Sequence, residues 1–159
     1  MAALDRIDLQ IVGLLRKNAR LSNKEIAERV GLAPSSCLVR TRQLQQAGVI
    51  TGFKAEVNPL ALGVGLQAMI SVRLKRHFKP DVEAFRQHAL DLPEVVRLYH
   101  VAGPIDFLCH VWTRDQEHLR DLAMTAFTAR DEVSHIETEL IFEHVSCREL
   151  PGFLENGSP

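Results

Sequence analysis

The chain has 159 residues, of which 46% are hydrophobic and 25% are charged, and its formal net charge is −1. This composition suits one ordinary domain or two small ones and excludes a disordered chain. No apolar run approaches the roughly 20 residues that cross a membrane, and the early acids Asp5 and Asp8 are untypical of a signal peptide. Three widely spaced cysteines form no C-x-x-C pair, which argues against a disulfide framework or zinc finger and indicates a reducing, cytoplasmic location.

A helix-turn-helix is predicted near the N-terminus. An apolar stripe with a period of 3.6 residues predicts a helix over residues 5–18, with Asp5 as its N-cap. Ser22 and Glu25 form an S-x-x-E capping box that begins a second helix, and Gly31 can take the left-handed conformation that ends it. The first helix is needed because two short helices cannot bury a core alone.

A third helix is predicted to begin at Pro34, where no backbone N–H is needed, and to end at Gly48. Cys37, Thr41 and Leu44 recur at i, i+4 and i+7 and should face the core. The opposite face carries the small, polar and cationic side chains that read base edges and bind phosphates, so this helix is predicted to enter the major groove of DNA. The candidate DNA-reading residues are Ser35, Ser36, Val39, Gln43 and Arg40, the last of which is expected to contact a guanine.

A β-hairpin is predicted over residues 49–57, which are rich in β-forming residues and have Gly52 as the turn. Three helices and a hairpin give the order of a winged helix-turn-helix domain, predicted for residues 1–58. That segment holds nine Lys/Arg and five Asp/Glu, a net charge of +4, whereas the rest of the chain sums to −5. Such a division is typical of a nucleic-acid-binding head on a body that does not bind nucleic acid. Arg42 and Lys54 are expected to contact phosphates.

The remainder predicts a hinge over residues 59–66 and then alternating strands and helices. Strands are predicted over residues 66–75, 95–102, 105–113 and 133–147, and helices over residues 80–92 and 115–130. The order β-α-β-β-α-β is that of the ferredoxin-like fold, a four-stranded antiparallel sheet with both helices on one face. The expected fold class is therefore α+β, with a ferredoxin-like domain over residues 67–150 and a C-terminal tail over residues 151–159.

The second face of this sheet would carry Met69, Leu108 and Trp112. An uncovered apolar patch of several hundred Å² is unusual in a monomer. The simplest cover is the same sheet of a second copy, related by a two-fold axis, and such a dimer would present two recognition helices about one DNA turn apart. The alternative cover is the N-terminal domain folded back on the sheet.

The order of these parts resembles the Lrp/AsnC family of transcriptional regulators, the leucine-responsive or feast/famine regulators. The resemblance spans about residues 4–150 and is carried by LDRIDLQIVGLLRKNARLSNKEIAERVGLAPSSCLVRTRQLQQAGVITGF, the NPLALG that follows and the turn VAGPID. It implies a DNA-binding regulator, not an enzyme, that forms homodimers and often octamers. It also implies that a small molecule, commonly an amino acid, binds between dimers as the effector, with no other cofactor.

By the same resemblance, Gly103 and Asp106 match a Gly-x-x-Asp turn near the effector, and Thr138 matches a threonine common near it. A zwitterionic amino acid needs N–H donors for its carboxylate, which a glycine turn exposes, and an acceptor for its ammonium, which Asp106 could supply. The other reading of Asp106 is a turn residue that bonds its own backbone. Adjacent candidates are His100, Pro104 and Ile105, although Pro104 removes one backbone donor.

Two other classes of protein stay open. A metal- or redox-responsive regulator would use the histidines and cysteines of the C-terminal half, such as Cys109-His110 and His144-x-x-Cys147. Alternation along a strand puts the members of each pair on opposite faces, which disfavours a shared metal. An enzyme would rest on fold analogy alone, because the chain has no H-E-x-x-H, P-loop, G-x-G-x-x-G or Ser/His/Asp order.

Overall fold

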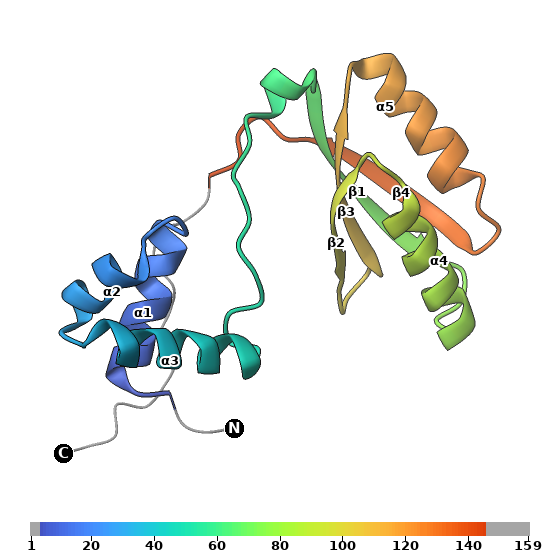
Figure 1. Ribbon diagram of the computed structural model, residues 1–159. Coiled ribbons are helices and arrows are strands. Elements are labelled where there is room, and N and C mark those ends of the chain that lie inside the picture. Colours follow the sequence, from blue (N-terminus) through green and yellow to red (C-terminus); the bar gives the residue numbers. More distant parts are fainter. Residues whose placement is uncertain (1–3, 146–159) are drawn as a thin grey trace. The chain divides into compact units, whose positions relative to one another are not determined.

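The computed structural model describes residues 4–145, which divide into two compact units (Figure 1). Of the described residues, one unit holds those up to Glu56 together with Val145, and the other spans Val57–His144. Each unit has its own cluster of buried hydrophobic side chains. None of the helices in the described part of the chain is both long enough and apolar enough to cross a membrane.

Three helices form the N-terminal unit: α1 (Arg6–Lys17), α2 (Asn23–Val30) and α3 (Pro34–Gln46). As predicted, Cys37 and Leu44 face inward from α3, while Thr41 is partly buried and donates its hydroxyl to the Cys37 carbonyl at 2.9 Å. The core that the three helices share is made of Ile11, Leu15, Ile26, Ala27, Cys37 and Leu44.

The ends of these helices follow the predicted capping signals. Asp5 is the N-cap of α1, and Ser22 with Glu25 forms a capping box at the start of α2. Gly31 ends α2 at a φ of +71°, a left-handed conformation that glycine adopts without steric cost. Ala33 gives α3 no side-chain cap, and the helix begins at Pro34, whose carbonyl accepts a hydrogen bond from the Asn23 side chain at 2.7 Å.

The hairpin predicted over residues 49–57 does not form. The chain has no strand between α3 and Pro59, and Phe53 and Val57 are about half exposed. Two strands alone are only marginally stable in water, and the described residues provide no third strand to pair with this stretch. The predicted hinge contains a short 3-10 helix, η1 (Pro59–Leu62), whose first turn is capped by the Asn58 side chain.

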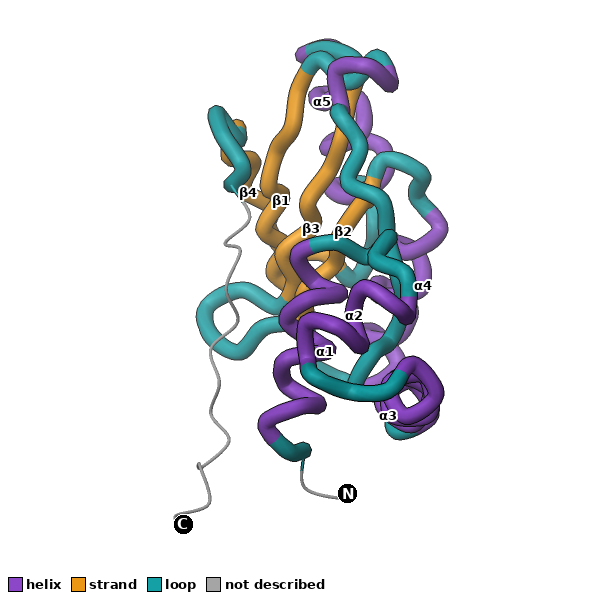
Figure 2. The backbone as a smooth tube through the Cα atoms, turned by 60° about the vertical axis from the view of Figure 1, so that its left-hand side comes forward, coloured by secondary structure: helices purple, strands orange, loops and turns teal. Residues whose placement is uncertain are grey.

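The C-terminal unit is a four-stranded sheet in the order β2-β3-β1-β4, with all neighbouring strands antiparallel. Its α-helices, α4 and α5, lie on one face of the sheet, as the ferredoxin-like prediction requires (Figures 1 and 2). The elements in chain order are β1 (Leu66–Leu74), α4 (Lys79–Asp91), β2 (Val95–His100), β3 (Phe107–Thr113), α5 (Gln116–Leu122), η2 (Ala123–Thr128) and β4 (Val133–Leu140).

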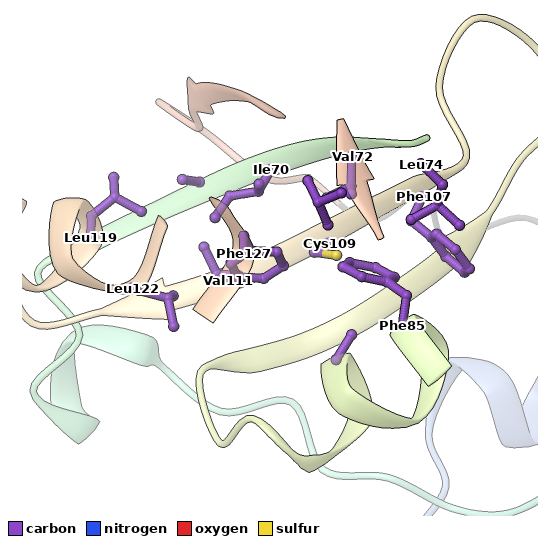
Figure 3. Close-up of a cluster of buried hydrophobic side chains, with 13 residues drawn as sticks. Ile70, Val72, Leu74, Phe85, Phe107, Cys109, Val111, Leu119, Leu122 and Phe127 are labelled. Carbon is purple, nitrogen blue, oxygen red and sulfur yellow. The ribbon is translucent and has the colours of Figure 1, made fainter. Parts of the chain in front are cut away.

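Side chains point alternately to the two faces of the sheet along β1. Ala68, Ile70, Val72 and Leu74 are buried against the helices, together with three aromatic rings (Figure 3). The ring centroids of Phe85 and Phe107 lie 4.8 Å apart, and those of Phe85 and Phe127 lie 6.1 Å apart. The strand register puts the predicted second-face residues together, because Gln67 pairs with Trp112, Met69 with His110 and Ser71 with Leu108. We call this second side the open face.

Two predicted elements end early. The helix expected over residues 115–130 is α-helical only to Leu122 and continues as the π-helix η2, in which the Thr128 hydroxyl donates to the Ala123 carbonyl at 3.0 Å. The strand expected over residues 133–147 ends at Leu140, and Phe142 beyond it is 97% exposed. No strand partner continues past Ile141, whose N–H donates to Gln67. Cys147 and the tail over residues 151–159 lie outside the described residues.

Gly65, just before β1, should not tolerate a side chain. Its N–H donates to the Thr113 carbonyl at 3.0 Å, and a Cβ there would lie 2.1 Å from the Arg114 carbonyl oxygen. We expect Gly65→Ala to lower the free energy of unfolding by about 1–3 kcal/mol.

At Gly13 in α1, a Cβ would meet no atom of another element within 4 Å, so Gly13→Ala should raise the free energy of unfolding by about 0.5–1 kcal/mol. Urea unfolding followed by circular dichroism measures both, and a neutral Gly65→Ala would contradict the close approach.

Candidate functional site

The predicted DNA-reading residues share one surface of α3. Ser35, Ser36, Val39 and Gln43 are all exposed, on the side of the helix opposite the buried Cys37 and Leu44. They line a shallow hollow with Arg40, Leu32 and two acids of α1, Asp5 and Asp8. The structure thus brings together the α3 side chains that the helical period selected, and adds two carboxylates that the sequence analysis had not placed there.

Arg40 is not a freely extended side chain. Its Nη1 donates to Asp5 Oδ2 at 2.6 Å and to Asp8 Oδ1 at 2.9 Å, and the side chain keeps 32% of its exposure. These hydrogen bonds raise the pKa of Arg40. The hydrogen bond from the Asp8 backbone N–H and, to a smaller extent, the one from Arg40 hold the pKa of Asp5 below its ordinary value. In the sequence, Asp5 and Asp8 are recognisable as an acidic pair at i and i+3 at the start of a helix. Only the fold shows that the cation they bind is Arg40.

The two predicted phosphate contacts lie in different settings. Arg42 is exposed on α3, and Lys54 is exposed in the irregular stretch that replaces the predicted hairpin. Neither makes an ion pair with any residue in the described range 4–145. Both cations are therefore available to a polyanion, although Lys54 does not project from a wing strand.

The Gly-x-x-Asp turn lies between β2 and β3. Asp106 is only 7% exposed, and its Oδ2 accepts a hydrogen bond from the Leu74 N–H at 2.8 Å. Its Oδ1 lies 2.7 Å from Nδ1 of His77. Asp106 therefore fastens the turn to the end of β1 and does not bond its own backbone through its side chain. Gly103 has a φ of +141°, which disfavours any residue with a side chain.

The other predicted effector residues are spread around this turn. His100 is exposed at its edge and stacks on Phe107 with ring centroids 4.7 Å apart, while Pro104 is exposed and Ile105 half-buried. Thr138 is exposed on β4, but the register puts Ile136, not Thr138, level with Phe107 across β1. A hollow at this end of the sheet that the sequence analysis missed is lined by Arg73, Leu74, Lys75, His77, Ser134 and His135.

Comparison with known proteins decides what these two units are. The winged helix-turn-helix DNA-binding family matches residues 4–51, and the Lrp/AsnC ligand binding domain family matches residues 67–151. The chain belongs to the Lrp/AsnC family. It is therefore a DNA-binding transcriptional regulator with an effector-binding domain, and the family consists of regulators, not enzymes.

Named relatives of this Lrp/AsnC regulator cover nearly the same length. The transcriptional regulator AldR of Mycolicibacterium smegmatis is 44% identical over 89% of this chain and 83% of its own. The leucine-responsive regulatory protein of Escherichia coli is 35% identical over 89% and 87%. A crystal structure of a Neisseria meningitidis transcriptional regulator in complex with L-Met superposes with a TM-score of 0.84, at 30% identity and over 91% and 94% of the two chains.

The metal- or redox-responsive alternative finds no support in the geometry. Within residues 4–145, no group of three or more His, Cys, Asp or Glu side chains could hold a metal ion. Cys109 lies in the core on the helix side of β3, while its neighbour His110 is on the open face. His144 is near His110, with ring centroids 6.1 Å apart, but its predicted partner Cys147 lies outside the described residues.

Cys109 should be chemically inert in the folded protein. It is fully buried, and burial raises its pKa from 9.0 to about 12. Because the thiolate is the reactive form, iodoacetamide at about pH 8 should leave Cys37 and Cys109 unmodified in a Cys147→Ser variant, and should modify both after unfolding in guanidinium chloride. Rapid alkylation of the native variant, read by mass spectrometry, would contradict this prediction and favour the redox alternative.

The raised pKa of Cys109 also predicts that the free energy of unfolding falls as the pH rises from 9.0 toward about 12.

Proposed function

We propose that this Lrp/AsnC regulator reads DNA with the outward face of α3 and responds to an amino acid bound by its C-terminal domain. The observation that carries the first part is the exposure of Ser35, Ser36, Val39 and Gln43 along one side of a helix whose other side is core. Small and amide side chains there can approach base edges in the major groove, and Arg40 supplies the guanine contact.

Phosphate contacts would set the register of the protein on DNA. Arg42 and Lys54 are the proposed contacts, because both are exposed and make no ion pair within the described chain. The net charge of +4 over residues 1–58 supports an attraction that does not depend on base sequence. The near-neutral chain as a whole therefore contains a locally cationic DNA-binding domain.

The proposed effector site is the turn that Asp106 holds in place. Both Asp106 oxygens already bind Leu74 and His77, so Asp106 is not a free acceptor for the effector ammonium. The effector carboxylate is assigned to the backbone N–H groups of Gly103 and Ile105, which the glycine turn exposes. The solved complex of a family relative with L-Met supports an amino acid as the ligand class. His100, Pro104 and Thr138 would flank the ligand, and Pro104 withdraws the donor that other residues would offer.

We further propose that a second copy covers the open face. Met69, Leu108 and Trp112 lie together there, and each is only partly buried within the described residues 4–145. A partner sheet would bury the remaining surface of these apolar side chains. Assembly of such dimers to octamers in the cytoplasm, with the effector between dimers, would link ligand binding to the spacing of the DNA-binding domains.

Lys54→Ala should weaken binding to every DNA sequence by a similar factor. Without this phosphate contact, binding of the protein releases about one counterion fewer from the DNA. The magnitude of the slope of log affinity against log salt should therefore fall by about one. Lys79→Ala, at the exposed start of α4 in the other domain, is the matched control and should leave both quantities unchanged. Fluorescence anisotropy titrations over a salt series measure both, and an unchanged slope would remove Lys54 from the interface.

An amino-acid effector should stabilise the folded protein. A ligand that binds only the native state raises the free energy of unfolding by about 2.7 kcal/mol at a concentration of 100 times its Kd. Thermal unfolding against the twenty amino acids should therefore single out a small set of effectors. The same compounds should change the sedimentation coefficient and the affinity for DNA. Constant melting temperature, assembly and DNA affinity across saturating amino acids would contradict an amino-acid response in this regulator.

A further inference from the structure

In the contact between α1 and α3, each of two carboxylates, those of Asp5 and Asp8, uses one oxygen for the helix cap and the other for Arg40. Asp5 accepts the Asp8 N–H on Oδ1 at 2.8 Å and Arg40 on Oδ2 at 2.6 Å. Asp8 accepts the Asp5 N–H on Oδ2 at 3.2 Å and Arg40 on Oδ1 at 2.9 Å. The hydrogen bonds of the capping box therefore hold both carboxylates in place independently of Arg40.

Arg40 uses only one of its nitrogens in this arrangement. Nη1 donates to both carboxylates, whereas Nε and Nη2 have no hydrogen-bond acceptor among residues 4–145. In a guanidinium group Nε and Nη2 form the side edge, on the side away from Nη1, and present two parallel N–H groups. Two parallel donors match the O6 and N7 acceptors of guanine in the major groove.

The position of Arg40 suits this second task. Its side chain is 32% exposed, and it lines the same shallow hollow as the exposed Ser36, Val39 and Gln43. An arginine held in one rotamer before binding loses less conformational freedom when it meets a base. The held guanidinium also has a single direction of approach, which makes a mismatched base harder to accommodate.

We propose that Asp5 and Asp8 are specificity-determining positioning residues that hold Arg40 by Nη1 and leave its Nε–Nη2 edge to read a guanine. The proposal rests on the proposed role of α3 as the reading helix. It also assigns a cost to the two acids. The cluster of Asp5, Asp8 and Arg40 carries a net charge of −1, which repels phosphates and weakens binding to all DNA. Asp5 and Asp8 thus lower affinity in general and raise the discrimination between base sequences.

The test compares discrimination with affinity. Duplexes that the wild-type protein prefers are selected from a random pool, and a single G·C to A·T change identifies the pair whose replacement costs most. Kd is then measured on the preferred and the changed duplex for Asp5→Asn/Asp8→Asn. Asparagine is also a good N-cap, so α1 should still begin at the same place. The ratio of the two Kd values should fall by about fivefold or more, while affinity for the changed duplex rises.

Two further variants separate charge and folding from positioning. Glu28→Gln/Glu56→Gln removes the same two negative charges from exposed positions of the N-terminal unit, and should raise affinity for both duplexes with an unchanged ratio. Arg40→Lys keeps the cation that the two acids bind but cannot present two parallel donors. It should retain the unfolding midpoint of the wild type within experimental error and lose the same discrimination as the Asp variant.

The outcomes that overturn the proposal are distinct from those that overturn the proposed function. An unchanged Kd ratio in Asp5→Asn/Asp8→Asn would overturn the proposal. If Arg40→Lys also keeps the ratio, the three residues are a brace between helices with no part in reading, and if Arg40→Lys loses it, Arg40 reads DNA without being positioned by the acids. A higher ratio in the Asp variant would mean that the acids withhold Arg40 from DNA. If the wild-type protein selects no preferred duplex from the pool, the reading role of α3 itself fails.

Discussion

The alternation of side chains along β1 is the constraint on which the C-terminal domain depends. One side of the strand supplies the buried centre of the aromatic core, and the other supplies the open face. Both ends of β1 are fixed by backbone contacts: Gly65 lies against the Arg114 carbonyl, and the Leu74 N–H donates to Asp106. A shift of β1 by one residue would exchange the two sides and disconnect the Gly-x-x-Asp turn. The proposed effector site and the proposed dimer surface therefore share one structural origin.

In the N-terminal domain, the same two carboxylates cap one helix and bind a second helix. The capping box at Asp5 and Asp8 begins α1, and its remaining oxygens join α1 to α3. Ala33 provides no side-chain cap for α3, so α3 is held by its packing, by the hydrogen bond from Asn23 to the Pro34 carbonyl and by this ion pair. In both domains a carboxylate that the sequence presents as a local turn or cap residue also binds a group more than 25 residues away.

Local patterns were sufficient where the decisive interaction is local. Period-3.6 stripes and capping boxes predicted α1 to α3, and period-2 alternation predicted the two faces of β1 and, with the element order, the antiparallel sheet. The hairpin after α3 failed because β-propensity cannot form a strand without a partner. The Asp106 contacts with Leu74 and His77, and the Arg40 ion pairs, could not be predicted, because they join residues about 30 apart that only the fold brings together. The family resemblance supplied the proposed effector turn, which no pattern in this chain indicates by itself.

The chain has a single tryptophan and a single tyrosine, Trp112 and Tyr99. Both lie on the open face, since Tyr99 pairs with Leu108 and Trp112 pairs with Gln67. The intrinsic ultraviolet emission of this protein therefore originates at one surface, and the helix-turn-helix is spectroscopically silent. Emission wavelength and quenching by iodide report whether that surface is wet or covered. Neither measurement needs a label, and both work at concentrations where assembly can be followed by dilution.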